Sequence, residues 1–198
     1  MKITMKALFL FLVILVVSTE FACTESSNPC VPKRTSGPLV PLVVGNQWVY
    51  HVITFDEQGN ITSNSTYDTN RVISDTLIQG ERWFFYYGLF EYCVNRSDGL
   101  WVRGYLTPDS LTDYLAYKFP GEKGDTNILS SNVIVSTDTV ISTEYGCFHT
   151  YEYVVDDAGI QAHNFFAPGI GLIKSEGWYK FTPPYKIRES SLRSAELH

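Results

Sequence analysis

Charged residues are scarce in this sequence, and the usual catalytic signatures are absent from it. Asp, Glu, Lys and Arg make up 18% of the 198 residues, with 21 acidic against 15 basic. A net charge of −6 excludes the basic surface that a nucleic-acid partner requires. The sequence contains no phosphate-binding loop, no HExxH zinc motif and no GxSxG nucleophile elbow, so we expect no cofactor and no catalytic residue.

Long apolar runs are also absent, and the longest, residues 7–17, is too short to cross a bilayer. Lys2 and Lys6 precede this run, and Ala22 and Cys23 follow it. This arrangement resembles the leader of bacterial lipoproteins, which is cut before a cysteine that then carries lipid. We therefore expect a signal peptide over residues 1–22 and acyl chains on Cys23 that anchor the protein in the outer membrane. An ordinary secretory signal that ends near this cysteine is the alternative.

Residues 24–38 are rich in Ser, Pro and Thr and show no apolar periodicity. This composition is typical of a linker, so residues 23–38 are expected to form the lipidated cysteine and a flexible tether. The remaining residues, 39–198, are enough for one domain and too few for two. The tether shows no obvious sorting signal, and both faces of the outer membrane stay open as the location of the domain.

From residue 39 onward the sequence indicates short β-strands separated by turns. Aromatic residues make up 15% of the chain and often stand beside β-branched ones, as in WVYHVITF at residues 48–55. Residues 110–120 are compatible with a short helix or a strand, and we favour the strand. About ten or eleven strands with short connections predict an all-β fold, a single antiparallel meander. Because so wide a sheet curls, we expect a strongly curved sheet or an incomplete barrel.

The segment at residues 81–89 is apolar on both of its predicted faces. Side chains alternate along a strand, so Trp83, Phe85 and Tyr87 point to one face, and Phe84 and Tyr86 point to the other. In a curved sheet, one face packs on the core and the other faces the concave side. We expect the first set to contact a hydrophobic or amphiphilic ligand, or the second set if the faces are reversed. The alternative is that all these rings simply fill the core.

Four cysteines occur, at positions 23, 30, 93 and 147. If Cys23 is lipidated, three remain, and an exported protein allows one disulfide bond among them. Cys93 and Cys147 both lie in strand-like stretches, so they are the pair we expect if a bond forms. Two buried free thiols are an equal alternative. No CxxC motif and no Cys/His cluster with zinc-site spacing occurs, so no metal site is expected.

Three stretches resemble a group of exported lipoproteins from Bacteroidota and related phyla. They are PLVVGNQWVY at residues 41–50, YKFP followed by GDT at residues 117–126, and FAPGIGLIK at residues 166–174. The resemblance implies the curved antiparallel sheet of lipoprotein carriers such as LolA and LolB. It implies no catalytic residue, and a shared fold does not transfer function.

Three hypotheses on function follow from these patterns. The first is a non-catalytic envelope lipoprotein that holds a hydrophobic or amphiphilic ligand on a concave aromatic face. The second is a structural or protein-interaction module of the envelope, in which the long polar strand at residues 61–78 recruits a partner protein by strand addition. The third, which we rank last, is an enzyme such as a glycan hydrolase, and it requires a pocket with His149 or His163 beside a buried carboxylate.

Overall fold

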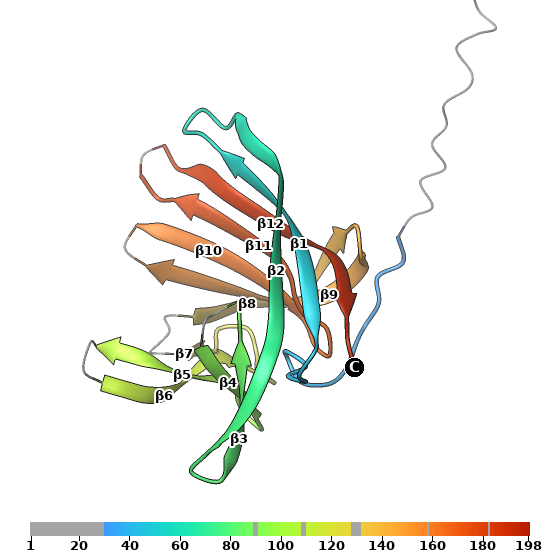
Figure 1. Ribbon diagram of the computed structural model, residues 1–198. Coiled ribbons are helices and arrows are strands. Elements are labelled where there is room, and N and C mark those ends of the chain that lie inside the picture. Colours follow the sequence, from blue (N-terminus) through green and yellow to red (C-terminus); the bar gives the residue numbers. More distant parts are fainter. Residues whose placement is uncertain (1–29, 89–90, 108–109, 128–131, 158, 182) are drawn as a thin grey trace, which may run out of the picture. The chain divides into compact units, whose positions relative to one another are not determined.

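The computed structural model consists of β-strands, turns and extended segments (Figure 1). The structure describes residues 30–198 except 89–90, 108–109, 128–131, 158 and 182. The signal peptide expected over residues 1–22, the lipid site at Cys23 and the first part of the predicted tether therefore lie outside the described residues. In the part of the chain that the structure describes, no helix has the length and apolarity needed to cross a membrane.

Twelve strands are seen among the described residues, close to the ten or eleven that the sequence predicts, and the short β7 is the additional one. Residues 110–120 form a strand over most of their length, as we favoured. The strands are β1 (Gln47–Phe55), β2 (Ile61–Ile78), β3 (Glu81–Tyr86), β4 (Glu91–Arg96), β5 (Gly99–Thr107), β6 (Ser110–Lys118), β7 (Thr126–Asn127), β8 (Asn132–Thr143), β9 (Gly146–Asp157), β10 (Ile160–Ala167), β11 (Gly171–Tyr179) and β12 (Tyr185–Glu196).

All twelve strands belong to one antiparallel, nearly closed barrel-like sheet, so the predicted fold class is confirmed. Most strands pair with their neighbours in sequence, as short connections require. The exception is the pairing of the first strand with the last: Gln47 of β1 lies opposite Glu196 of β12, and Thr54 lies opposite Arg188. This pairing joins a meander of β2–β6 to a meander of β7–β12 and leaves β6 and β7 as the two ends of the sheet.

The two end strands, β6 and β7, lie in contact, and side chains of β8 and β9 help to hold β6. The amide of Asn132 donates to the backbone carbonyl of Ala116 at 2.6 Å. The hydroxyl of Tyr153 donates to the backbone carbonyl of Lys118 at 2.7 Å. Both bonds run from the β8–β9 side of the opening to β6, so side-chain hydrogen bonds help to close the sheet.

Residues 33–42, which we call the strap, pack along the sheet. Lys33 forms a parallel bridge with Phe148, and Asn95 donates its side-chain amide to the carbonyl of Val40 at 2.8 Å. Leu39 and Val40 are buried in the main core. The prediction of a flexible tether over residues 23–38 is therefore wrong from Lys33 onward, because backbone and apolar contacts that composition does not reveal hold this segment on the domain.

The strap meets the turn between β10 and β11 where Gly37 lies against Gly169. The backbone N–H of Gly169 donates to the carbonyl of Pro38 at 2.6 Å. Gly169 has a φ of +77°, and a Cβ at this position would lie 2.1 Å from the carbonyl oxygen of Ser36. The glycine is needed here both for its left-handed backbone and for the close approach of the strap.

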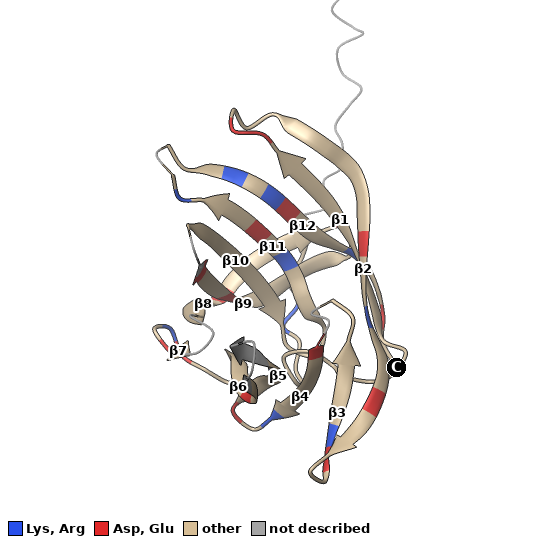
Figure 2. Cartoon of the chain, turned by 60° about the vertical axis from the view of Figure 1, so that its left-hand side comes forward, with Lys and Arg blue, Asp and Glu red and all other residues tan. Residues whose placement is uncertain are grey.

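Acidic and basic residues lie close together on β11 and β12 (Figure 2), and they alternate with the cavity-lining Ser175 and Gly177, so they lie on the convex face. Lys174 lies 2.9 Å from Glu176 and 3.1 Å from Glu189. Lys186 contacts the same two carboxylates at 3.0 and 2.8 Å. These two basic and two acidic side chains neutralise one another on the outside of the sheet.

Candidate functional site

Part of the concave side of the sheet is filled by aromatic rings. Trp48 packs edge-on against Tyr86 with ring centroids 5.6 Å apart, and Tyr153 packs edge-on against Phe166 at 5.7 Å. These rings belong to one core cluster with the strap residues Leu39 and Val40. In this region the interior is occupied by the protein's own side chains, which is the alternative that the sequence left open.

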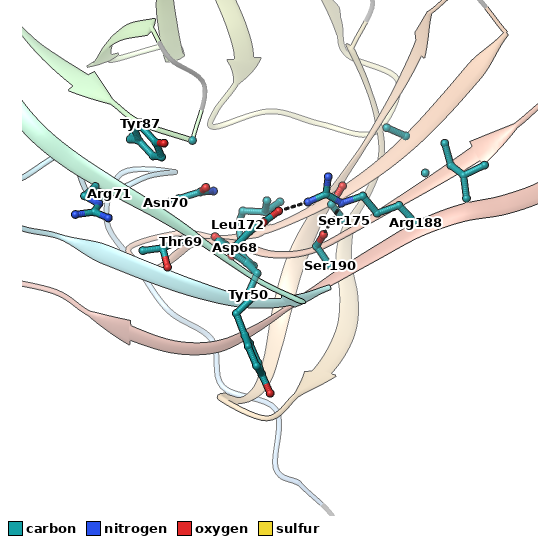
Figure 3. A pocket seen from close by; sticks show the side chains of 15 residues that line it. Tyr50, Asp68, Thr69, Asn70, Arg71, Tyr87, Leu172, Ser175, Arg188 and Ser190 are labelled. Carbon is teal, nitrogen blue, oxygen red and sulfur yellow. Dashed lines mark hydrogen bonds and ion pairs between the residues drawn. The ribbon is translucent and has the colours of Figure 1, made fainter. Parts of the chain in front are cut away.

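The rest of the concave side contains a cavity of about 750 Å³ (Figure 3). Its walls come from β1, β2, β10, β11 and β12, and from the turn that follows β3. The lining residues are Tyr50, residues 67–71, Tyr87, Gly88, Ala162, Leu172, Ser175, Gly177, Ile187, Arg188 and Ser190.

Small residues on neighbouring strands leave room for this cavity. Ala162 of β10 lies directly opposite Gly177 of β11, and Gly177 lies directly opposite Arg188 of β12. Because directly opposed residues share a face of the sheet, two adjacent positions of one row carry almost no side chain. A Cβ on Gly177 would already come within 3.3 Å of Ile187. The hollow therefore follows from this row of small residues as well as from the curvature of the sheet.

Arg188 is a charged residue of the cavity wall with two polar side-chain partners. Its guanidinium forms an ion pair with Asp68, and its Nε donates to the hydroxyl of Ser190 at 3.2 Å (Figure 3). The side chains of Arg188 and Asp68 are 51% and 47% exposed, so the pair stands in solvent-accessible space. Ser175 donates its hydroxyl to the side-chain oxygen of Asn164 at 2.8 Å and adds a further polar group to the wall.

The floor of the cavity is a cluster of hydrogen-bonded phenol and amide groups. The hydroxyl of Tyr50 donates to the backbone carbonyl of Leu172 at 3.0 Å. Asn70 lies in side-chain hydrogen-bonding contact with Tyr50 and with Tyr86. Burial raises the pKa of Tyr50 and that of Tyr86 well above the usual tyrosine range. Both phenols are therefore neutral at physiological pH, and they offer a polar but uncharged surface beneath the cavity.

Of the three predicted ligand contacts, only Tyr87 lines the cavity. Tyr86 lies in the core cluster, so strand alternation turns Phe85 and Trp83 to the convex face. There Phe85 packs against Tyr92, with ring centroids 5.4 Å apart. The expectation that Trp83 and Phe85 face the concave side is therefore wrong. Phe84 and Tyr86 face that side instead, but they pack in or against the core and do not line the cavity.

Trp83 is buried although it lies on the convex face. The guanidinium groups of Arg96 and Arg103 each lie 5.4 Å from the centre of its ring. Arg96 also forms a bidentate pair with Glu81, which lowers the pKa of that carboxyl. Long arginine side chains thus shield the indole from water, a contribution to burial that an apolar pattern does not reveal.

The predicted disulfide bond between Cys93 and Cys147 is wrong. Cys93 is a free, buried thiol, whereas Cys147 is disulfide-bonded and Cys30 is disulfide-bonded as well. Cys93 lies on β4 and Cys147 at the start of β9, and at least four strands stand between them in either direction around the nearly closed sheet. Sequence alone shows that both residues lie in strands, but it does not show how far apart those strands are.

The histidines considered for an enzyme do not line the cavity. His149 contacts the carboxylate of Asp138, and His163 lies 2.8 Å from that of Glu152. In the described part of the chain, no group of three His, Cys, Asp or Glu side chains could hold a metal ion. The sequence singled out none of the polar cavity residues, although Asp68 and Asn70 belong to the long polar strand that it did identify.

Comparison with known proteins finds no family model and no curated protein that matches this sequence. A crystal structure of a proposed lipoprotein from Parabacteroides distasonis is similar, with a TM-score of 0.47 and 12% identity over 82% of this chain and 100% of that one. A crystal structure of a proposed exported protein with a YmcC-like fold, from Bacteroides fragilis, has a TM-score of 0.42 and 14% identity over 79% of this chain and 98% of that one. The similarity to LolA and LolB stays a prediction.

Proposed function

We propose that the protein is a non-catalytic binding protein of the bacterial cell envelope that holds an amphiphilic molecule in the concave cavity. The single observation that carries this proposal is the cavity itself. Its volume of about 750 Å³ lies within the range of about 300–1,000 Å³ that small-molecule sites occupy. The leader sequence and Cys23 support the envelope location, and acyl chains on Cys23 anchor the domain in the outer membrane.

The lining favours an amphiphile over a purely apolar ligand. Leu172, Ile187 and Ala162 supply apolar surface. Arg188 and Asp68 supply charge at a solvent-accessible position, and burying such groups under a purely apolar molecule costs free energy. A ligand with one polar end and one apolar end matches both parts of the wall.

Titration of the purified full chain carrying Cys23→Ser with lysolaurylphosphatidylcholine, below its micelle concentration, tests the proposal by calorimetry. We expect saturable binding of one molecule per chain. Ala162→Leu fills the hollow and should weaken binding by at least about tenfold, or about 1.4 kcal/mol. Gln161→Leu, on the opposite face of the same strand, is the matched control. Absence of binding, or equal affinity of both variants and the parent, contradicts the proposal.

A second candidate function, recruitment of an envelope protein by strand addition, is favoured by the edge of β2. Residues 61–70 pair with β1 on one side, and on the other side the backbone pairing of β2 with β3 and its following turn begins only at Arg71 among the described residues. Asp68 is the single charged residue in residues 61–70. Natural edge strands are usually protected by several charges or by proline, so this edge is open to pairing.

Ser65→Pro tests this second candidate, because Ser65 lies in the register shift between Val52 and Thr54 of β1, where proline disturbs the existing ladder least. We expect the parent chain to pull down one envelope protein and the variant to lose it while keeping the circular dichroism spectrum of the parent. Recovery of the same proteins by both chains contradicts strand addition at this edge.

A further inference from the structure

The charges that line the cavity are not balanced. Arg71 and Arg188 are its two cationic residues, and Asp68 is its one carboxylate among the described lining residues. The chain as a whole carries a net charge of −6, so a local excess of positive charge is contrary to the general charge of the protein. Positive charge that faces a hollow attracts anions, because electrostatic potential is concentrated in concave surfaces with low-dielectric walls.

The guanidinium of Arg188 has N–H donors available for a ligand. One terminal nitrogen is paired with Asp68, and Nε donates to Ser190. A guanidinium has five N–H donors, so these two bonds leave several available. The residue directly opposite Arg188 on β11 is Gly177, so no side chain from that position covers the guanidinium. Half of the Arg188 side chain is exposed, and Figure 3 shows it extending along the cavity toward Asp68.

Asp68 stands where an anionic ligand would compete for the guanidinium. Its carboxylate occupies one edge of Arg188 and is itself about half exposed, so solvent reaches the pair. Exposed ion pairs contribute only about 0–1 kcal/mol, and a ligand therefore displaces such a partner at low cost. A carboxylate or phosphate group also forms parallel hydrogen bonds with a guanidinium, which a neutral headgroup does not.

Arg71 adds to the positive side of the site. It lies at the end of the stretch of β2 that lines the cavity, and its guanidinium lies 5.8 Å from the centre of the Tyr87 ring. Tyr87 in turn donates its backbone N–H to the carbonyl of Arg71 at 2.8 Å, which ties this turn to β2. A second cation thus lies beside the cavity, on a strand that only β1 separates from the strand of Arg188.

We propose that the cavity selects an anionic amphiphile, whose carboxylate or phosphate headgroup replaces Asp68 on Arg188 while its chain lies against Leu172 and Ala162. This inference rests on the proposed function, since it names the class of ligand that the same cavity takes. The headgroup is defined by its negative charge and by oxygen acceptors that match a guanidinium.

Affinities of the full chain carrying Cys23→Ser for four amphiphiles with the same alkyl chain test the proposal. They are laurate, dodecyl phosphate, neutral dodecyl maltoside and dodecyltrimethylammonium. We expect laurate or dodecyl phosphate to bind at least about tenfold more tightly than the neutral and cationic compounds, the scale of a hydrogen-bonded charge pair. Preference between the two anions identifies the headgroup as a carboxylate or a phosphate.

Three variants assign the preference to Arg188. Arg188→Gln should weaken the binding of the preferred anion by about tenfold and leave dodecyl maltoside unaffected. Asp68→Asn should strengthen the binding of the anion, because it removes the competing carboxylate. Arg193→Gln is the matched control, because Arg193 lies on the same strand, pairs with Glu144 at 3.3 Å and does not line the cavity. The circular dichroism spectra of all three should match that of the parent.

The outcomes separate this inference from the proposed function. Equal affinity for the four compounds, or an anion preference that Arg188→Gln does not reduce, overturns the anionic headgroup and leaves amphiphile binding standing. Weaker anion binding by Asp68→Asn also overturns it, because Asp68 would then assist the ligand. Absence of binding by all four compounds overturns both.

Discussion

The indole N–H of Trp48 donates a hydrogen bond of 2.6 Å to the backbone carbonyl of Ile170, which lies 122 residues further along the chain. Ile170 immediately precedes β11, which lies two strands from β1 in the sheet. The bond therefore joins the stretch PLVVGNQWVY to the stretch FAPGIGLIK. The hydroxyl of Tyr50 repeats the connection by donating to the carbonyl of Leu172. Two of the stretches that resemble a lipoprotein family are therefore one structural unit, which supports the floor of the cavity.

Removal of the Trp48 indole donor should lower the free energy of unfolding more than the same change at the half-buried Trp178. Trp48→Phe leaves the buried carbonyl of Ile170 without this donor and should cost about 1–3 kcal/mol in the free energy of unfolding. Trp48→Ala also creates a cavity and should cost about 3–5 kcal/mol. Urea denaturation followed by circular dichroism measures both values. Trp178→Phe, at a half-buried indole beside Lys186, is the control and should cost less than about 1 kcal/mol.

The docking of the strap should make Gly169 far more sensitive to substitution than Gly59. Both residues have nearly the same left-handed backbone, with φ of +77° and +79°. Alanine at Gly59 meets no atom within 4 Å, so Gly59→Ala should cost only the backbone strain, about 1–2 kcal/mol. Gly169→Ala places a Cβ against the carbonyl of Ser36 and should cost at least about 2 kcal/mol more.

The comparison of these two glycine variants by thermal or urea unfolding isolates the contact with the strap from the backbone strain. Equal destabilisation by Gly169→Ala and Gly59→Ala contradicts a strap that is packed on the sheet in solution.

The free thiol of Cys93 should be inert in the native protein. Burial raises its pKa to about 12, and Glu91 adds to the shift. The thiolate is the reactive species, so at pH 8 almost none is present, and the side chain is also closed to reagents. In the Cys23→Ser chain, a thiol reagent should label no site under native conditions and one site per chain in denaturant. Rapid labelling of the native protein would contradict the buried position on β4.

Glu91 should make the fold less stable as pH rises. Burial raises the pKa of this carboxyl above the ordinary value of 4.5, and the hydrogen bond from Tyr114 opposes the shift only in part. Because the folded state holds its proton to a higher pH than the unfolded state, the free energy of unfolding falls as pH rises from about 4.5 through the folded pKa. Glu91→Gln removes this dependence and should raise the melting temperature at neutral pH relative to the parent.

Glu81→Gln is the control of opposite sign. The hydrogen bonds from Arg96 lower the pKa of Glu81, so its contribution to stability is present above the ordinary glutamate pKa and is lost as pH falls through the lowered value. This variant should lower the melting temperature at neutral pH. Melting curves between pH 4 and pH 8 measure both variants, and a change of the same sign in both would contradict the assignment.

Composition and local pattern predict where the strands lie, but they do not predict which side chains of each strand face the concave side. The alternation in residues 48–55 and the turn residues after each strand locate most strand ends within a few residues. In residues 81–89, however, both faces are apolar, so the pattern does not distinguish concave from convex. The structure decides it because Tyr86 packs on Trp48, while arginine side chains cover Trp83 on the convex side.

The sequence predicted only one residue of the candidate site. Tyr87 was identified from its apolar strand, but Arg188, Asp68 and Gly177 come from strands far apart in the chain. No spacing rule relates them, because residue pairs such as Gly177 and Arg188 become neighbours only through the register of adjacent strands. The same reason explains why the partner of Cys147 was wrongly assigned.

By itself, the sequence determined an all-β meander, since β-branched and aromatic residues that alternate between turns favour extended backbone over helix. It also determined that so wide a sheet must curl. Only the tertiary structure decided that β1 pairs with β12, that the strap packs on the sheet and that the concave side is hollow beside Arg188. These features depend on contacts between residues distant in sequence, and the free energy of such contacts is set by which surfaces meet after the chain has folded.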